Sequence, residues 1–156
     1  MLVKTENLKK HFQIGRGQNL HAVDGLSIEI AENEILGLVG ESGSGKSTFG
    51  KTLIGLPPAP SGKAYYKGEE LPQRFTAADH LKYSQELQMI FQDPYSSLNP
   101  RMTVLDIVGE GISIQGQHTQ SQVKELVAEW LIKVGLNADH MSRYPHEFSG
   151  GQRQRI

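Results

Sequence analysis

The sequence predicts an α/β fold in which short strands alternate with amphipathic helices. Three observations support this class. Residues 26–30 alternate apolar and polar side chains, the pattern of a half-buried strand. Residues 35–39 form a continuous apolar run, as expected for a strand covered on both faces, and lead directly into a glycine-rich loop. Residues 120–134 carry apolar side chains at helical spacing.

The other elements of the first 91 residues are expected in chain order. The first thirty residues predict strands, interrupted by a glycine-rich loop at residues 15–19. A helix should begin near Lys46, because Phe49 and Leu53 share one helical face, and Pro57-Pro58 prevents its continuation. Residues 64–66, flanked by glycine turns, predict a hairpin strand. The apolar run at residues 87–91 predicts a further strand.

Two capped helices are expected further along the chain. Thr103 and Asp106 form one capping pair, and Thr119 and Gln122 form the other. The second helix should end at Gly135. The apolar stripe of the first helix consists of Val104, Ile107, Val108 and Ile112. The stripe of the second, with Trp130 expected in the core, consists of Val123, Leu126, Val127, Trp130, Leu131 and Val134.

Composition excludes several classes of protein. Sixteen basic residues balance seventeen acidic ones, so no nucleic-acid partner is expected. No apolar run approaches the roughly 18 to 20 residues that cross a bilayer, and the first residues lack the apolar core of a signal peptide. The absence of cysteine suits a cytosolic protein. A membrane role is therefore expected only through a partner.

The six histidines show no recognised metal-ligand spacing along the sequence. Neither H-x3-H nor H-E-x-x-H occurs, and we read most of these residues as surface or loop histidines. The only metal expected from the sequence is a magnesium ion carried by a nucleotide.

Residues 40–47 read Gly-Glu-Ser-Gly-Ser-Gly-Lys-Ser and fit the phosphate-loop pattern G-x-x-x-x-G-K-[ST]. Glycines allow backbone N–H groups to turn toward phosphate oxygens. Lys46 supplies a cation for the β- and γ-phosphates, and the Ser47 hydroxyl can ligate Mg²⁺. A P-loop nucleoside-triphosphatase fold is therefore predicted. Its nucleotide-binding loop residues are Gly40, Glu41, Ser42, Gly43, Ser44, Gly45, Lys46, Ser47 and Thr48.

A second glycine-rich stretch, Ser149-Gly150-Gly151-Gln152, provides a hydroxyl and two glycine amides at the start of a helix, which is another anion site. Together with the phosphate loop, it resembles the nucleotide-binding subunits of ABC transporters, whose signature sequence is close to L-S-G-G-Q. The resemblance implies that ATP is the nucleotide and that two subunits pack head to tail. Residues 149–152 would then contact the ATP held by the second subunit.

Two further residues follow the chain order of this family. Phe12 stands where an aromatic ring stacks on adenine, although a place in the strand core is the alternative. Gln92, directly after an apolar run, matches the Q-loop glutamine that senses Mg²⁺ and the attacking water. The resemblance thus implies catalytic roles for Lys46 and Gln92, and Mg²⁺ contacts from Ser47 and Gln92.

Residues 88–103 and 143–152 resemble the peptide-uptake branch of the family, which covers importers of dipeptides and oligopeptides with nickel and glutathione relatives. The resemblance extends from about residue 2 to residue 156. It implies transmembrane permease subunits as partners and, indirectly, a substrate-binding protein. It also implies a peripheral position at the cytoplasmic side of the inner membrane.

The expected organisation has three parts. Residues 1–92 form an antiparallel β subdomain and the phosphate-loop part of the ATPase core, residues 93–148 form a helical subdomain, and residues 149–156 carry the signature and the start of the next helix. Family members continue with an apolar strand ending in Asp-Glu, a D-loop and a switch histidine. Since this sequence has no counterpart of them, we expect an incomplete ABC ATPase fold, truncated after the signature, that is marginally stable and does not hydrolyse ATP alone.

Two other interpretations remain open. The chain can be a non-catalytic partner that contributes residues 149–152 to a complete subunit, or only a dimerisation module. Measuring ATPase activity after mixing with a complete subunit separates these from the leading interpretation. A cytosolic kinase shares the phosphate loop, but it explains neither Gln92 nor residues 149–152.

Overall fold

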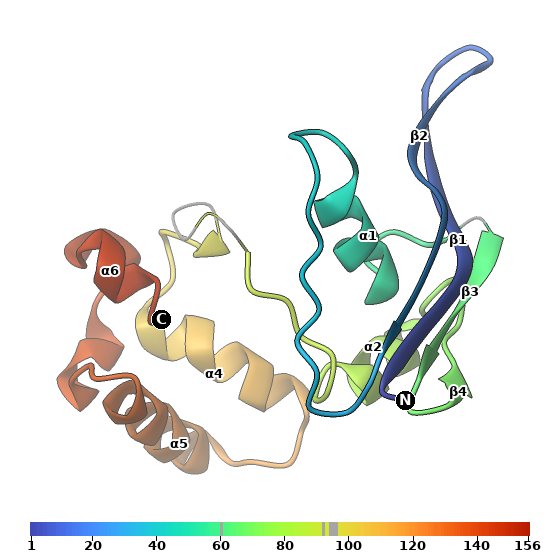
Figure 1. The fold of residues 1–156 in the computed structure, drawn as a ribbon. Helices are drawn as coiled ribbons and strands as arrows, with labels where there is room; N and C mark the ends of the chain where they lie inside the picture. The colour runs from blue at the N-terminus through green and yellow to red at the C-terminus, as the bar shows by residue number, and fades with distance from the viewer. Residues whose placement is uncertain (60, 92, 94–96) are drawn as a thin grey trace. The chain divides into compact units, whose positions relative to one another are not determined.

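A computed structural model of the chain describes residues 1–59, 61–91, 93 and 97–156. The chain forms two compact units, Met1–Met89 and Ile90–Ile156 (Figure 1). Each unit has a hydrophobic core of its own, built around Leu8 and Phe49 in the first and around Val104 and Val127 in the second.

The first unit is built on a four-stranded antiparallel sheet with the strand order β2-β1-β3-β4. Strands β1 (Val3–Gly15) and β2 (Gln18–Ile30) form a long hairpin, and β3 (Ser61–Tyr66) pairs with the other edge of β1 (Figure 1). The short β4 (Glu69–Glu70) completes the sheet. The strands expected near residues 1–30 and 64–66 are confirmed, and the turn at the first hairpin is tighter than the loop expected at residues 15–19.

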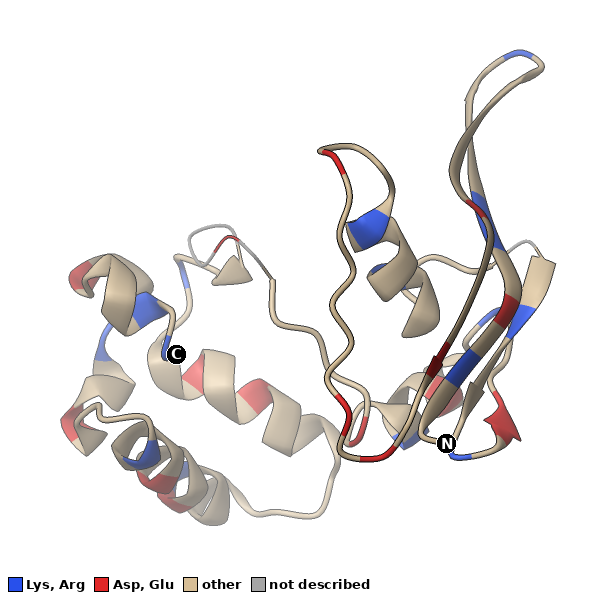
Figure 2. Ribbon diagram, viewed as in Figure 1, with Lys and Arg blue, Asp and Glu red and all other residues tan. Residues whose placement is uncertain are grey.

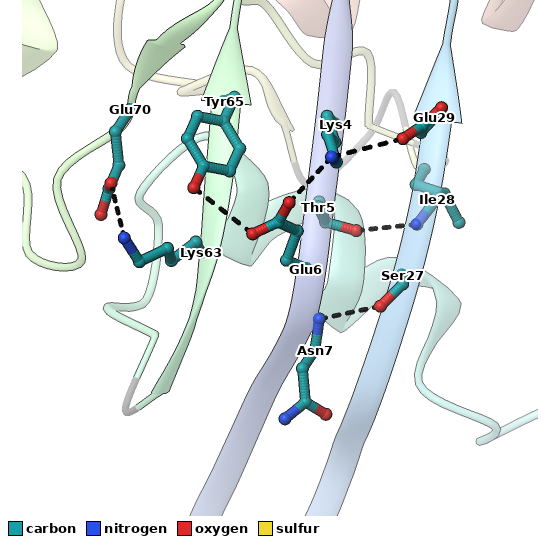
Figure 3. A network of polar contacts seen from close by, with 10 residues as sticks. All are labelled: Lys4, Thr5, Glu6, Asn7, Ser27, Ile28, Glu29, Lys63, Tyr65 and Glu70. Atoms are coloured by element: carbon teal, nitrogen blue, oxygen red, sulfur yellow. Dashed lines mark hydrogen bonds and ion pairs between the residues drawn. The ribbon is translucent and has the colours of Figure 1, made fainter.

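The strand β1 alternates buried and solvent-facing side chains. Thr5 is almost fully buried, and its hydroxyl donates to Leu26 O and accepts from Ile28 N, both at 3.1 Å. On the opposite face Lys4 pairs with Glu6 at 2.8 Å and with Glu29 at 3.5 Å (Figure 3). The hydrogen bond from Lys4 holds the pKa of Glu6 below its ordinary value. This cross-strand arrangement fixes the register of the hairpin.

Charged residues of both signs are interspersed in each unit. Figure 2 shows Lys and Arg distributed among Asp and Glu rather than separated from them. The ion pairs of the described residues, such as Lys63 with Glu70, lie on the surface. This distribution agrees with the near-neutral composition.

Two helices pack on the sheet of the first unit. Helix α1 (Lys46–Leu53) buries Phe49 and Thr52, and helix α2 (Ala77–Tyr83) buries Tyr83. The first was expected and the second was missed. Thr76 and Asp79 form a complete capping box at the start of α2, so the Thr-x-x-Asp pattern was the signal that could have revealed it.

Two apolar segments that were expected to be strands are not strands. Residues 35–39 have no regular secondary structure, and Ile35 and Val39 are 97% and 94% exposed. Residues 87–91 are likewise irregular, with Ile90 98% exposed. A strand requires a neighbour for its backbone N–H and C=O groups, and no strand of the described ranges pairs with either segment. The expectation of strands here was wrong for this chain.

The second unit is helical. It contains α4 (Val104–Ile114), α5 (Gln120–Lys133), the 3₁₀ turns η1 (Ala138–Ser142) and η2 (Pro145–Glu147), and α6 (Gly150–Arg153). The capping boxes expected at Thr103 and Thr119 are both confirmed. Gly135 ends α5 in the left-handed region (φ 73°), as expected. In the part of the chain that the structure describes, no helix has the length and apolar character needed to cross a membrane.

The expected burial of Trp130 is wrong. The buried side chains of α5 are Val123, Val127 and Leu131, which follow one another at intervals of four residues and form a narrow stripe. Trp130 lies at the edge of this stripe and is 53% exposed. The Lys133 ammonium lies 4.3 Å from its ring centroid, a cation–π contact on the surface.

Candidate nucleotide-binding site

The glycine-rich loop ends at the first turn of α1. Gly43 and Gly45 adopt positive φ angles of 81° and 92°, which favour glycine. Gly45 is the N-cap of α1 and offers no side chain to the helix amides. The first amides of a helix have no partner within it, and they carry the positive end of the helix dipole. The sequence thus folds into a cradle of N–H groups suited to phosphate.

The Lys46 side chain turns back into this loop. Its Nζ donates hydrogen bonds to Gly40 O at 2.7 Å, to Glu41 O at 2.6 Å and to Ser44 Oγ at 3.2 Å. A flexible ammonium group can exchange such oxygen partners without losing its hydrogen bonds. The cation is therefore held inside the loop, surrounded by three oxygen atoms of the loop itself.

The loop is packed against the hairpin through its last glycine. A Cβ atom added at Gly45 would lie 1.9 Å from the carbonyl oxygen of Ala22 in β2. Only glycine permits this approach, since the added atom would overlap backbone rather than a side chain that can move away. The hairpin and the phosphate loop are thereby held together within the first unit.

A pocket of about 320 Å³ lies between the hairpin and the loop. Its walls contain residues from both elements: Phe12, Leu20, His21, Ala22, Gly43, Ser44, Gly45, Lys46, Ser47 and Thr48. Phe12 is 37% exposed and is not part of the buried core. Its ring also contacts the Lys10 ammonium at 4.9 Å from the centroid. An aromatic face is thus available beside the phosphate cradle.

The remaining predicted site residues of the first unit also belong to this loop. Ser47 is exposed at the start of α1, where its hydroxyl can serve as a ligand for Mg²⁺, and Thr48 is half-buried beside it. Glu41 and Ser42 are exposed at the tip of the loop. Gln92 lies outside the described residues, so the structure gives no position for it.

Residues 149–152 lie at the start of α6 in the second unit. Ser149 Oγ accepts from Gln152 N at 3.3 Å, and Gln152 Oε1 accepts from Ser149 N at 3.0 Å, which forms a capping box. The preceding Phe148 is only 4% exposed and anchors the turn in the core. The amides of Gly150 and Gly151 occupy the first two positions of the helix, where amides have no partner in the helix itself.

Sequence reasoning missed the contribution of β2 to the pocket. Leu20, His21 and Ala22 line it together with Phe12. The signal was present in the hairpin, because Phe12 pairs with Leu20 across the two strands. A register derived from the tight turn at Arg16-Gly17 would have placed these residues opposite Phe12.

The architecture matches solved structures of ATP-binding cassettes. The dimeric MJ0796 cassette in a post-hydrolysis state, bound to ADP and Pi, has a TM-score of 0.81 and 25% sequence identity, and the match covers 99% of this chain and 66% of that one. CbiO1 from Clostridium perfringens, part of the cbiONQ ABC transporter complex, has a TM-score of 0.74 at 23% identity, covering 99% and 58%. The fold is the ABC ATPase fold, with its antiparallel β subdomain.

The chain belongs to the ABC transporter family, whose sequence model matches residues 23–156. It is 51% identical to the oligopeptide transport ATP-binding protein OppF of Bacillus subtilis (strain 168), over 99% of this chain and 51% of that protein. It is 43% identical to OppF of Escherichia coli (strain K12), over 100% and 49%. The resemblance expected from the sequence is confirmed. The chain spans about half the length of these relatives.

Proposed function

We propose that the chain is the ATP-binding part of an ABC importer subunit that couples ATP binding and hydrolysis to the uptake of oligopeptides. The observation that carries this proposal is the Lys46 ammonium, held in the phosphate loop by the carbonyl oxygens of Gly40 and Glu41. Phosphate oxygens of ATP can take the place of these carbonyls. The oligopeptide transport proteins among the relatives support a peptide cargo.

The proposed roles follow the lining of the pocket. The adenine ring stacks on Phe12, while the β- and γ-phosphates contact Lys46 and the amides of the loop, of which residues 43–47 line the pocket. Ser47 and Gln92 hold the Mg²⁺ that accompanies ATP, and Thr48 contacts a neighbouring phosphate oxygen. The role of Gln92, as a sensor of Mg²⁺ and of the attacking water, rests on its place in the family motif.

A second ATPase subunit is the proposed partner of residues 149–152. Because Ser149 Oγ accepts a hydrogen bond from Gln152 N, its hydroxyl hydrogen remains able to donate to a phosphate of the partner's ATP. Gly150 and Gly151 add amides to the same anion site. Closure of such a dimer would drive transmembrane permease subunits, contacted through residues 93–148, at the cytoplasmic side of the membrane. A substrate-binding protein would deliver the peptide to them.

We further propose that these 156 residues bind ATP without turning it over. Phosphoryl transfer depends on groups that position Mg²⁺ and the attacking water. No apolar strand in the sequence ends in the two adjacent carboxylates that serve this purpose in the family. Steady ATP hydrolysis by the purified chain, above that of a Lys46→Ala variant, would contradict this part of the proposal.

A titration with a fluorescent ATP analogue and Mg²⁺ tests the binding site. Each charge-assisted hydrogen bond lost in Lys46→Ala is worth about 1.5–3 kcal/mol, so affinity should fall roughly ten- to a hundredfold or more. Lys133→Ala is the matched control, because Lys133 contacts Trp130 on α5 and should leave affinity unchanged. Equal affinity of Lys46→Ala and the unchanged chain would overturn the assignment.

The cargo requires a separate experiment. The full-length subunit is assembled with its permease subunits in membrane vesicles, and uptake of a labelled tripeptide is measured with ATP on the cytoplasmic side. Uptake that depends on ATP and is lost in Lys46→Ala supports peptide import. ATP hydrolysis without peptide uptake would support the ATPase assignment but contradict the proposal that the cargo is a peptide.

A further inference from the structure

Three side chains of the β1–β2 hairpin bring their polar atoms together outside the phosphate loop. His11 in β1 lies directly opposite His21 in β2, and their rings stack with centroids 3.9 Å apart. The carboxylate of Asp24 faces both rings: its Oδ1 lies 3.4 Å from His11 Nε2, and its Oδ2 lies 3.4 Å from His21 Nδ1. One ligand atom of each residue lies within 4.8 Å of the other two.

The cluster contains an unsatisfied polar atom. His11 Nε2 is buried and has no hydrogen-bond partner among the described residues, although Asp24 Oδ1 lies 3.4 Å away. A buried nitrogen left in this state is unfavourable. Coordination to a metal ion would satisfy it.

We propose that His11, His21 and Asp24 bind a divalent transition-metal ion of the zinc class, with water completing the coordination. Imidazole nitrogen and carboxylate oxygen are ordinary zinc ligands, and two histidines with one carboxylate leave an open position for water. Tetrahedral bonds of about 2.0–2.2 Å place ligand atoms about 3.4 Å apart. Each histidine lies at this separation from one oxygen of Asp24, His11 from Oδ1 and His21 from Oδ2.

Binding requires one ring to turn. The lone pair of an imidazole nitrogen lies in the plane of its ring, so two stacked rings cannot both direct their nitrogens at one ion. The His21 side chain is 55% exposed and has room to rotate, whereas His11 is 26% exposed and more tightly held. Movement of His21 away from the stacked position is thus the step that would open the site.

A competing cation lies beside the cluster. Lys9 Nζ is 3.4 Å from Asp24 Oδ1, the same oxygen that faces His11. A metal ion must displace this ammonium or share the carboxylate with it. Removal of the Lys9 charge should therefore strengthen metal binding, an effect that a purely structural role of the cluster would not produce.

The proposed site is distinct from the Mg²⁺ carried by ATP, but it adjoins the nucleotide pocket. His21 lines that pocket, and Ala22, which touches the phosphate loop at Gly45, lies between His21 and Asp24. The metal would join β1 to β2 next to this contact. Metal binding is for this reason measured without nucleotide.

The test is a titration of the purified protein with Zn²⁺ in competition with a chromogenic chelator. We expect one ion per chain, and a loss of affinity of at least about tenfold in His21→Gln and in Asp24→Asn. His118→Gln is the matched control, since His118 lies outside the cluster, and it should bind as the unchanged protein does. Lys9→Met should bind more tightly.

Co²⁺ provides a second measurement on the same proteins. Its visible absorption should report a tetrahedral site in the unchanged protein and in His118→Gln, and this signal should be lost in His21→Gln. Circular dichroism without metal checks that each variant is folded, and Asp24→Asn serves if His21→Gln is not. The proposal is overturned if no stoichiometric Zn²⁺ is bound, or if the folded cluster variants bind it as tightly as the control does.

Discussion

The carbonyl oxygen of Ala22 occupies the space that a side chain at Gly45 would need. The distance from this oxygen to an added Cβ would be 1.9 Å, and Gly45 also has a φ of 92°. A conformational requirement and a steric one therefore coincide at one residue. This contact fixes the start of α1 against β2 and so shapes the floor of the candidate nucleotide pocket.

The first prediction concerns a graded series of glycine substitutions. Gly45→Ala should abolish binding of a fluorescent ATP analogue and lower the melting temperature, because strain and overlap act together. Gly43→Ala should lower the free energy of unfolding by about 1–2 kcal/mol, because its φ is positive although the space around it is open. Gly37→Ala is the control, because Gly37 has no positive φ and an added Cβ would meet no atom within 4 Å. Normal nucleotide binding by Gly45→Ala would show that the contact with Ala22 is dispensable.

The second prediction separates two roles of Phe12. If its ring stacks on adenine, Phe12→Ala should weaken ATP binding by about 1–3 kcal/mol and Phe12→Trp should preserve it. Stability should change little in either variant, because the side chain is substantially exposed. Calorimetric titration and thermal melting measure the two effects. A drop in unfolding free energy of about 3–5 kcal/mol, with unchanged affinity, would instead identify Phe12 as core.

The third prediction compares neighbours on α5. Leu131 is 2% exposed and Ile132 is 61% exposed. Leu131→Ala should destabilise the second unit by about 2–5 kcal/mol through the cavity that it leaves. Ile132→Ala should change stability by about 0.5 kcal/mol or less. Urea denaturation followed by Trp130 fluorescence reports on this unit directly, and equal losses in the two variants would contradict the observed burial.

The fourth prediction concerns pH. Glu86 accepts hydrogen bonds from Lys67 and from the Tyr66 hydroxyl, and the bond from Lys67 is the main reason that the pKa of Glu86 lies below its ordinary value. A carboxyl group with a lowered pKa stabilises the fold above its unfolded pKa and ceases to do so as pH falls through the folded one.

The measurement compares the chain with Glu86→Gln by urea denaturation at several pH values. The unchanged chain should be the more stable near pH 7, and the difference should shrink once pH falls below about 4.5, the ordinary pKa of glutamate. A difference that grows toward acid pH would have the wrong sign for this ion pair.

Local chemistry allowed much of the fold to be predicted from the sequence. The capping pairs at Thr103 and Thr119, the glycine end of α5 and the alternation in β2 each depend on residues a few positions apart. The exposed segments at residues 35–39 and 87–91 were assigned wrongly, because an apolar run indicates a strand only when a neighbour supplies hydrogen bonds. Trp130 was misplaced because periodicity alone does not fix the width of the buried stripe.

For the candidate site, too, the sequence indicated the residues that are close together along the chain and missed those that meet only in the fold. The phosphate loop is a contiguous motif, so its residues could be proposed one by one from the sequence, and residues 43–48 do line the pocket. The facing wall of Leu20 and His21, and the pairing of His11 with His21, depend on the register of a hairpin. Residues that pair across two strands can lie far apart in the sequence. A search for histidines at short metal-ligand spacings therefore does not find His11 and His21.

The hydrogen bonds of Lys46 have a consequence for the energetics of nucleotide capture. The loop already surrounds its ammonium with the oxygens of Gly40, Glu41 and Ser44. In the proposed binding of ATP, the arriving triphosphate would exchange places with these oxygen ligands around one nitrogen, and no disordered segment would have to fold. Little conformational entropy would be lost in such an exchange, because the loop is already organised around the Lys46 ammonium before the nucleotide binds.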